Sequence, residues 1–245
     1  RRIVETPAGM LNAIGLENPG ADVFIAEKLP ALKKIGVPLI VRILGHDDGQ
    51  FISLTEKFNQ AQDIAAIELN LSCPNLGHKK LVAQDPGATQ RIVSAVKKIS
   101  RYPIIAKLSP NVTDITEIAQ AAKAAGADAV SLINTLTGMK IDIKTRRPVL
   151  GNVTGGLSGP AIRPVAVNMV YQVAKKIDIP IIAMGGVMTA EDAIELMIAG
   201  ATMVAVGTYN FINPQAPLEI LFGIKKYLQE NNIEDINQLI RSVEI

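Results

Sequence analysis

Six short apolar segments recur along the chain, each about as long as a β-strand. They are rich in β-branched residues and almost continuously apolar, which is typical of strands that are buried on both faces. The segments are residues 38–44, 65–70, 103–108, 129–134, 180–184 and 203–207. Strands of this kind occur in parallel sheets covered by helices, so the pattern predicts parallel strands.

Longer amphipathic segments lie between the apolar ones, with apolar positions near the 3.6-residue period of an α-helix. We expect helices at residues 51–62, 86–99, 114–125, 160–176, 190–199 and 215–229. Asp85 before Pro86 is typical of a helix start, and Gly126 and Gly200 stand where helix C-termini are expected. The alternation of strand and helix predicts an α/β protein.

A weak internal repeat refines this fold prediction. Pro-Ile-Ile-Ala at 103–106 recurs at 180–183, and Ala-Gly-Ala at 125–127 recurs at 199–201. Each is part of a unit of helix end, glycine and buried strand, as a β/α barrel repeats it. We therefore predict a (β/α)8 TIM barrel in a single domain over residues 1–245, with about six of its eight βα units present. An open doubly wound sheet is the structural alternative.

The chain begins with Arg1 rather than Met, and we expect that an N-terminal segment with the first two strands is missing. The barrel is favoured over the open sheet because polar residues cluster at the C-terminal ends of nearly every predicted strand. In a barrel these ends face one cavity.

Composition narrows the possible functions. Hydrophobic residues make up 48% of the chain and charged residues 20%, which excludes a disordered protein. A net charge of +2 and the absence of Trp give no case for binding nucleic acid or an anionic membrane. A single cysteine, Cys73, excludes an internal disulfide and an iron–sulfur cluster held by this chain, and it favours the cytoplasm.

Candidate functional residues stand at the ends of the predicted strands. Gly185 and Gly186 end one strand, and Gly207 and Thr208 end the next. Backbone N–H groups at such turns suit a phosphate, and loops after the last two strands are the recurrent phosphate site of β/α barrels. Tight turns without a ligand are the simpler reading, but the pairing of the two turns favours phosphate binding.

Lys107 lies within an apolar segment, where an unpaired ammonium group is costly to bury. We expect it to stabilise an anionic cofactor or intermediate, with a structural ion pair as the alternative. Cys73 alone would be unremarkable as a small buried side chain. Its polar neighbours Asn70 and Asn75 favour a general base beside a planar substrate with amide edges. Neither histidine has partners spaced for a metal site, so no metal is expected.

Five motifs together resemble the dihydroorotate dehydrogenases. They are Gly-Met-Leu-Asn-Ala-Ile-Gly-Leu at 9–16, Asn-Leu-Ser-Cys-Pro-Asn at 70–75, Lys-Leu-Ser-Pro-Asn-Val at 107–112, Ile-Asn-Thr at 133–135 and Thr-Gly-Gly-Leu-Ser-Gly-Pro at 154–160. Cysteine in the second motif resembles the soluble class 1 enzymes, since the membrane-associated class 2 uses serine. The stretch 141–148 looks most like class 1B catalytic subunits.

The resemblance implies an FMN-containing β/α barrel that oxidises dihydroorotate to orotate in de novo pyrimidine biosynthesis. Cys73 would remove the C5 proton of the substrate, and Lys107 would lie at the flavin ring. The residues implied to contact substrate are Asn12, Ala13, Ile14, Gly15, Leu16, Asn70, Asn75, Asn134 and Thr135. Those implied to contact FMN are Asn70, Lys107, Ile133, Gly159, Gly185, Gly186, Gly207 and Thr208.

The resemblance also implies partners. Class 1B enzymes work with a second subunit that carries FAD and a [2Fe–2S] cluster and passes electrons to NAD, and their catalytic subunits form homodimers. A chain with one cysteine cannot ligate such a cluster, which is consistent with a cluster on another chain.

The chain departs from the family pattern at two places. Arg42 stands where the family usually has an FMN-contacting Asn, and residues 77–81 replace a usual Gly-Gly and aromatic. We expect Arg42 to face the FMN or an acidic side chain, because a guanidinium is always charged. Two alternatives stay open: a dihydropyrimidine dehydrogenase-like flavoenzyme, and a non-catalytic barrel that has lost its flavin.

Overall fold

The computed structural model describes residues 1–71 and 82–245. The chain divides into two compact units. Unit 1 comprises Arg1–Ile14, Ser109–Ile115 and Ser131–Ile245, and unit 2 comprises Gly15–Leu108 and Thr116–Val130. The prediction of a single domain over residues 1–245 stays a prediction.

Unit 2 contains neighbouring parallel strands with helices between them in sequence. The strands are β3 (Ile40–Ile43), β4 (Ala66–Asn70) and β5 (Ile104–Lys107). The helices are α3 (Asp48–Asn59), α4 (Pro86–Ile99) and α5 (Ile115–Ala124). The N–H of Asp128 donates to the carbonyl of Ile104 at 2.8 Å, so the chain entering β6 (Ala129–Leu132) lies beside β5.

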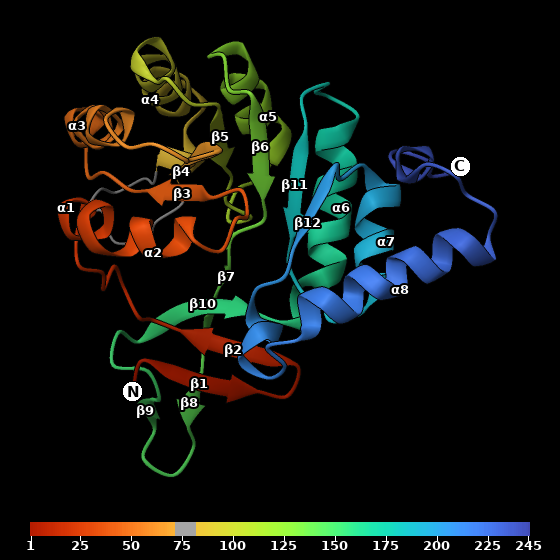
Figure 1. Cartoon of the computed structure of the whole chain (residues 1–245). Coiled ribbons are helices and arrows are strands. Elements are labelled where there is room, and N and C mark those ends of the chain that lie inside the picture. The colour runs from red at the N-terminus through yellow and green to blue at the C-terminus, as the bar shows by residue number, and fades with distance from the viewer. Residues whose placement is uncertain (72–81) are drawn as a thin grey trace. The chain divides into compact units, whose positions relative to one another are not determined.

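Alternation along these strands separates two faces. Val41 and Ile43 on β3 are buried, and so are Ile67 and Leu69 on β4. Helices α3 and α4 pack on each other and against the strands (Figure 1). Phe51 on α3 lies in the core. Burial of these apolar side chains accounts for the predicted strand pattern.

Helix boundaries in unit 2 follow the predicted caps. The Asp85 side chain accepts from the N–H of Gly87 at 2.9 Å, and Pro86 opens α4 where a missing N–H is harmless. A helical segment at the start of unit 2 was not predicted from the sequence. It consists of α1 (Ala21–Val23), η1 (Phe24–Lys28) and α2 (Leu29–Lys33). The short 3-10 turn η2 (Val82–Gln84) precedes α4.

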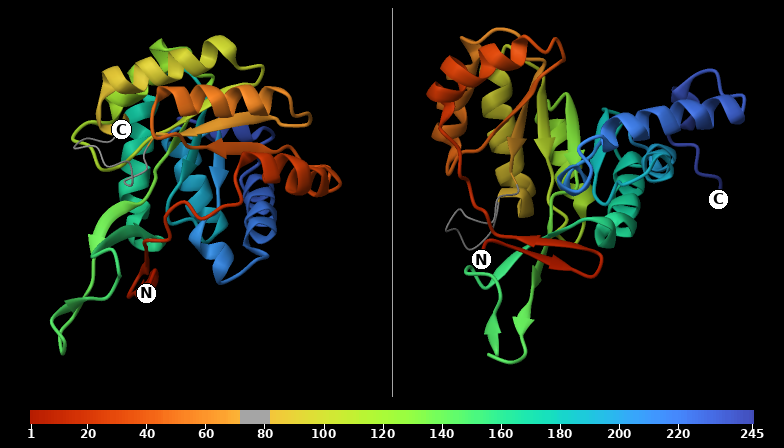
Figure 2. Two further views of the ribbon diagram at one scale, coloured as in Figure 1. Left: turned by 90° about the vertical axis from the view of Figure 1, so that its left-hand side faces the viewer. Right: turned by 60° about the horizontal axis from the view of Figure 1, so that its bottom comes forward.

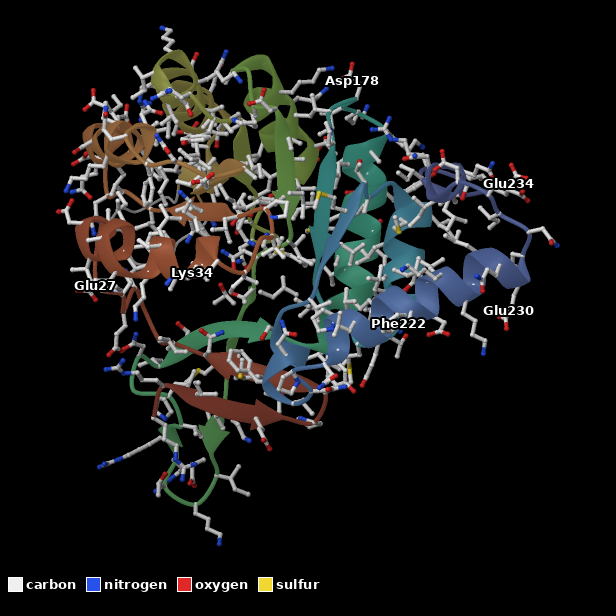
Figure 3. All side chains as sticks on the ribbon, in the orientation of Figure 1. Glu27, Lys34, Asp178, Phe222, Glu230 and Glu234 are labelled. Carbon is white, nitrogen blue, oxygen red and sulfur yellow. The ribbon has the colours of Figure 1, made fainter. Side chains whose placement is uncertain are left out.

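Unit 1 contains a second group of βα elements. Its parallel strands are β11 (Ile181–Met184) and β12 (Met203–Ala205), and its helices are α6 (Arg163–Ala174), α7 (Ala190–Ala199) and α8 (Ala216–Glu230). Helix α7 packs between α6 and α8. On α8, Ile220 is buried, whereas Phe222 on its other side is 63% exposed. Figure 3 labels Phe222 on this helix. The amphipathic helix predicted for this segment is therefore confirmed.

Unit 1 also contains an antiparallel sheet in the order β1, β2, β10, β7. Its strands are β1 (Ile3–Thr6), β2 (Gly9–Asn12), β7 (Leu136–Met139) and β10 (Thr154–Ser158). The hairpin of β8 (Ile141–Asp142) and β9 (Arg147–Pro148) extends from it, as Figures 1 and 2 show. Turns η3 (Pro160–Ile162), η4 (Thr208–Phe211) and η5 (Ile236–Leu239) complete the unit. The sequence reading did not predict this sheet.

The element order confirms the predicted α/β class. Strands β3, β4, β5, β6, β11 and β12 each precede one of the helices α3 to α8. The described residues thus hold six βα units, the number expected from the sequence. The antiparallel sheet arises from the first strands of the chain and from an insertion between β6 and α6.

Candidate active site

In unit 2, two of the predicted site residues stand side by side at the C-terminal ends of neighbouring strands. Asn70 on β4 and Lys107 on β5 are partners in the strand register. Both are buried, with 9% and 5% of their surface exposed. Parallel strands present such partners on the same face, so the amide and the ammonium group share one surface.

Glu68 belongs to the same face, because it lies two residues before Asn70 on β4. It is only 8% exposed, and its Oε2 lies 4.0 Å from the Nζ of Lys107. The sequence analysis did not assign Glu68 a role. The available signal was the same as for Lys107: an ionisable residue inside an otherwise apolar strand.

The environment of Lys107 lowers its pKa below the usual value for lysine. Burial is the main cause, since it disfavours the charged ammonium form. The carboxylate of Glu68 raises the pKa, and the guanidinium of Arg42 lowers it further. Glu68 and Arg42 therefore have opposite effects on the protonation of Lys107.

Arg42 on β3 is the register partner of Glu68, so it shares the face that carries Glu68 and Lys107. It alternates with Val41 and Ile43, which are buried on the opposite face. The sequence analysis expected Arg42 to face the FMN or an acidic side chain, and its position on this face leaves both as predictions. No ion pair of Arg42 is found among the described residues, and its contact with FMN stays a prediction.

In unit 1, three predicted substrate residues come together around β10. The Nδ2 of Asn12 donates to the carbonyl of Gly156 at 3.4 Å, and Thr135 packs so closely on Gly156 that a Cβ there would overlap it. The Oδ1 of Asn134 accepts from the N–H of Thr135 at 2.8 Å. The antiparallel sheet thus joins residues from the start and the middle of the chain.

Asn111 is a further polar residue of this cluster to which the sequence analysis gave no role. Its Nδ2 donates to the carbonyl of Thr135 at 3.0 Å, and its Oδ1 accepts from the N–H of Thr137 at 2.9 Å. These two bonds fix the backbone that carries Asn134 and Thr135. Its position in the motif at 107–112 was the available signal.

The remaining residues of the motif at 9–16 are divided between the units. Ala13 and Ile14 belong to unit 1, where the N–H of Ala13 donates to the carbonyl of Arg2 at 2.7 Å. Gly15 and Leu16 belong to unit 2 and are exposed. Contact of these four residues with a substrate stays a prediction.

The predicted cofactor residues of unit 1 also converge. The N–H of Ile133 donates to the carbonyl of Met184 at 2.9 Å, which brings it to the end of β11. Gly185 and Gly186 follow with φ of 134° and 76°, in the left-handed region that favours glycine. A Cβ on Gly186 would approach the carbonyl of Gly159 to 3.0 Å, so this turn lies against the end of β10.

Gly159, Gly185, Gly186 and Gly207 are called the glycine cluster. Two features of this cluster leave room for a ligand. The Oγ of Ser158 is buried and has no hydrogen-bond partner among the described residues. A Cβ on Gly207 would meet no atom of the described part of the chain within 4 Å. Met184 on β11 and Ala205 on β12 are register partners, so the two glycine turns follow at the same edge. Thr208 begins η4 directly after Gly207.

Cys73 and Asn75, the predicted base and a predicted substrate contact, lie outside the described residues. Among the residues that the structure describes, no helix is long and apolar enough to cross a membrane. The same part of the chain holds no group of three or more His, Cys, Asp or Glu side chains placed to hold a metal ion.

Comparison with known proteins identifies the family. The sequence profile described as "Dihydroorotate dehydrogenase" matches residues 1–228. A relative named "Dihydroorotate dehydrogenase B (NAD(+)), catalytic subunit" from Geotalea uraniireducens is 53% identical over 240 residues, which cover 98% of this chain and 79% of the relative. A protein of the same name from Alkaliphilus oremlandii is 54% identical, with the same coverage.

The chain belongs to the dihydroorotate dehydrogenase family. This family comprises flavin-dependent oxidoreductases that convert dihydroorotate to orotate in pyrimidine biosynthesis. The family assignment, the predicted enzyme class and the β/α-barrel fold class are confirmed. The names of the relatives as catalytic subunits indicate a separate partner subunit for those proteins.

Proposed function

We propose that this chain is the FMN-dependent catalytic subunit of a class 1B dihydroorotate dehydrogenase. The observation that carries this assignment is the buried Lys107 beside Asn70 at the ends of β5 and β4. A buried cation at this position suits a cofactor whose reduced form is anionic. The high identity with relatives named as NAD-dependent catalytic subunits supports the class.

The residues present fit FMN at the glycine cluster of unit 1. The Oγ of Ser158 supplies a buried hydroxyl that has no hydrogen-bond partner within residues 1–71 and 82–245. The open side of Gly207 allows a bulky group to approach the backbone. Gly185, Gly186, Gly207 and Thr208 would hold the phosphate through backbone N–H groups, as glycine turns at neighbouring strand ends commonly do. Ile133 and Gly159 would flank the flavin.

In the proposed reaction the chain's own residues bind dihydroorotate and move one proton. Asn12, Asn70, Asn75, Asn134 and Thr135 orient the ring through hydrogen bonds to its amide edges. Cys73 takes the proton from C5 as general base, while the C5–C6 bond gains double-bond character. Bound FMN supplies a hydride acceptor for C6. Lys107 places positive charge where negative charge develops.

The proposal extends to partners and location. The chain forms a homodimer and passes electrons to a second subunit with FAD and a [2Fe–2S] cluster, which reduces NAD. The single cysteine of the chain supports a cluster on another subunit and a reducing cytoplasm.

The direct test is a half-reaction. The full chain, loaded with FMN and mixed anaerobically with dihydroorotate, is expected to lose the flavin absorbance near 450 nm, a wavelength typical of oxidised flavins in general. Orotate should appear in an amount equal to the flavin reduced. Dihydrouracil, which lacks the carboxylate, serves as the control substrate. Reduction by dihydrouracil but not by dihydroorotate would contradict the proposal.

Ser158→Ala provides a test of the cofactor site. Loss of a hydroxyl that bonds to FMN should weaken FMN binding roughly 3- to 10-fold, the usual worth of one net hydrogen bond. Binding is measured by the quenching of FMN fluorescence on titration with protein. The matched control is Ser242→Ala, because the Oγ of Ser242 already donates to the carbonyl of Leu239 at 2.8 Å. Equal FMN affinities for the two variants would place Ser158 outside the site.

A further inference from the structure

We propose that Glu68 is a positioning residue for Lys107, whose ammonium group it holds charged and in place during flavin reduction. The inference rests on the proposed function, because it assigns Lys107 to the flavin. It adds Glu68 of β4, to which the sequence analysis assigned no role. The carboxylate of Glu68 acts on the ammonium group of Lys107, which lies on the neighbouring strand β5.

The geometry of β4 and β5 brings the two groups together. Asn70 is the register partner of Lys107, and Glu68 lies on the same face two residues earlier. The Oε2 of Glu68 and the Nζ of Lys107 are 4.0 Å apart. This is the distance of an ion pair rather than of a direct hydrogen bond.

Burial strengthens the electrostatic interaction between Glu68 and Lys107. Lys107 is 5% exposed and Glu68 is 8% exposed, so water screens neither charge well. A buried ammonium group without a counter-charge tends to lose its proton. A neutral Lys107 could not stabilise an anionic flavin. The carboxylate of Glu68 therefore protects the property on which the proposed role of Lys107 depends.

Arg42 makes the charged form of Lys107 less favourable, and the carboxylate of Glu68 opposes this effect. Among the described residues, Glu68 from β4 and Arg42 from β3 are the charged groups that act on Lys107. Asn70 from β4 is uncharged. Arg42 stands beside Glu68 in the register and disfavours the ammonium form of Lys107, while Glu68 favours it. The carboxylate of Glu68 thus opposes the effect of Arg42 on the charge of Lys107.

Two substitutions should move the charge of Lys107 in opposite directions. Glu68→Gln keeps the shape of the side chain and removes its charge, so the pKa of Lys107 should fall further below the usual value for lysine. Arg42→Gln removes a positive charge and should raise that pKa. The pKa is measured on the purified full chain by NMR of ¹⁵N-labelled lysine side chains, with Lys107→Met used to identify the signal.

The pH dependence of the half-reaction should shift in the same directions as the pKa of Lys107. If flavin reduction requires a protonated Lys107, its rate falls as the pH rises through the pKa of Lys107. Glu68→Gln should move this alkaline limb to lower pH, and Arg42→Gln should move it to higher pH. Glu68→Asp, which keeps the charge, should restore most of the wild-type profile. A purely structural role for Glu68 would lower stability without these opposite shifts.

The outcomes separate the inference from the proposed function. An unchanged Lys107 titration in Glu68→Gln would overturn the inference. If that variant does not fold, an unchanged or lowered pKa in Arg42→Gln would overturn it as well. If the pKa of Lys107 shifts but the pH profile of the half-reaction does not, Lys107 does not act on the flavin. That result contradicts the proposed role of Lys107 and leaves Glu68 without a part in the reaction.

Discussion

Cys73→Ala is expected to slow reduction of the flavin by dihydroorotate roughly 10²- to 10⁴-fold, the usual contribution of a positioned acid–base group. The substitution removes the thiol that is proposed to take the C5 proton, and none of the groups proposed to hold FMN. Flavin content and orotate binding should therefore stay close to those of the unmodified chain. Anaerobic stopped-flow absorbance measures the reduction, and the shift of the flavin spectrum on adding orotate measures binding.

Two further variants sharpen this experiment. Cys73→Ser replaces the thiol by a hydroxyl at the same position, and its reduction rate should lie between those of Cys73→Ala and the unmodified chain. Ser100→Ala is a remote control, because the Oγ of Ser100 donates to the carbonyl of Tyr102 at 2.8 Å in a local turn. Unchanged reduction kinetics in Cys73→Ala would show that another group is the base.

Gly207→Val is expected to release FMN. An added Cβ at this position would have no atom of residues 1–71 or 82–245 within 4 Å, so we expect the protein itself to accommodate the valine side chain. The same side chain would occupy the space through which a phosphate approaches the backbone. FMN affinity should fall roughly 100-fold or more, which corresponds to about 2.7 kcal/mol. The purified variant should be colourless and folded.

The flavin-to-protein ratio from absorbance and the midpoint of thermal unfolding without added FMN test both parts of this expectation. Gly151→Val is the matched control, because Gly151 is exposed and its nearest neighbour to a new Cβ is the carbonyl oxygen of Arg1 at 3.7 Å. It should keep its flavin. A Gly207→Val protein with a full complement of FMN would place the phosphate elsewhere.

Much of the fold could be predicted because parallel strands and their helices carry strong local patterns. Helix α4 begins at Pro86 behind Asp85, as its cap residues predicted, and the strands β3, β4, β5, β6, β11 and β12 fall within the predicted apolar segments. The helical segment from α1 to α2 escaped prediction. It is built from short pieces that give no extended period.

The antiparallel sheet of unit 1 could not be predicted for a different reason. Strand β2 pairs with β10, and the Asn12 side chain bonds to Gly156 across 144 positions of sequence. No local period contains such a pairing. The strands are also short and rich in glycine, so their own patterns are weak. The sheet nevertheless brings together Asn12 and Thr135, which the motifs had already singled out.

The sequence by itself determined the βα repeat and the family, since both are written in local periodicity and in contiguous motifs. It also identified Lys107 as unusual, because an ionisable residue in an apolar strand is visible without a structure. Only the tertiary structure decided which charges act on that lysine. Strand register places Arg42 beside Glu68 and Asn70 beside Lys107, and burial makes their charges count. Electrostatic coupling depends on distance and on exclusion of water, and both arise when separate strands pack together.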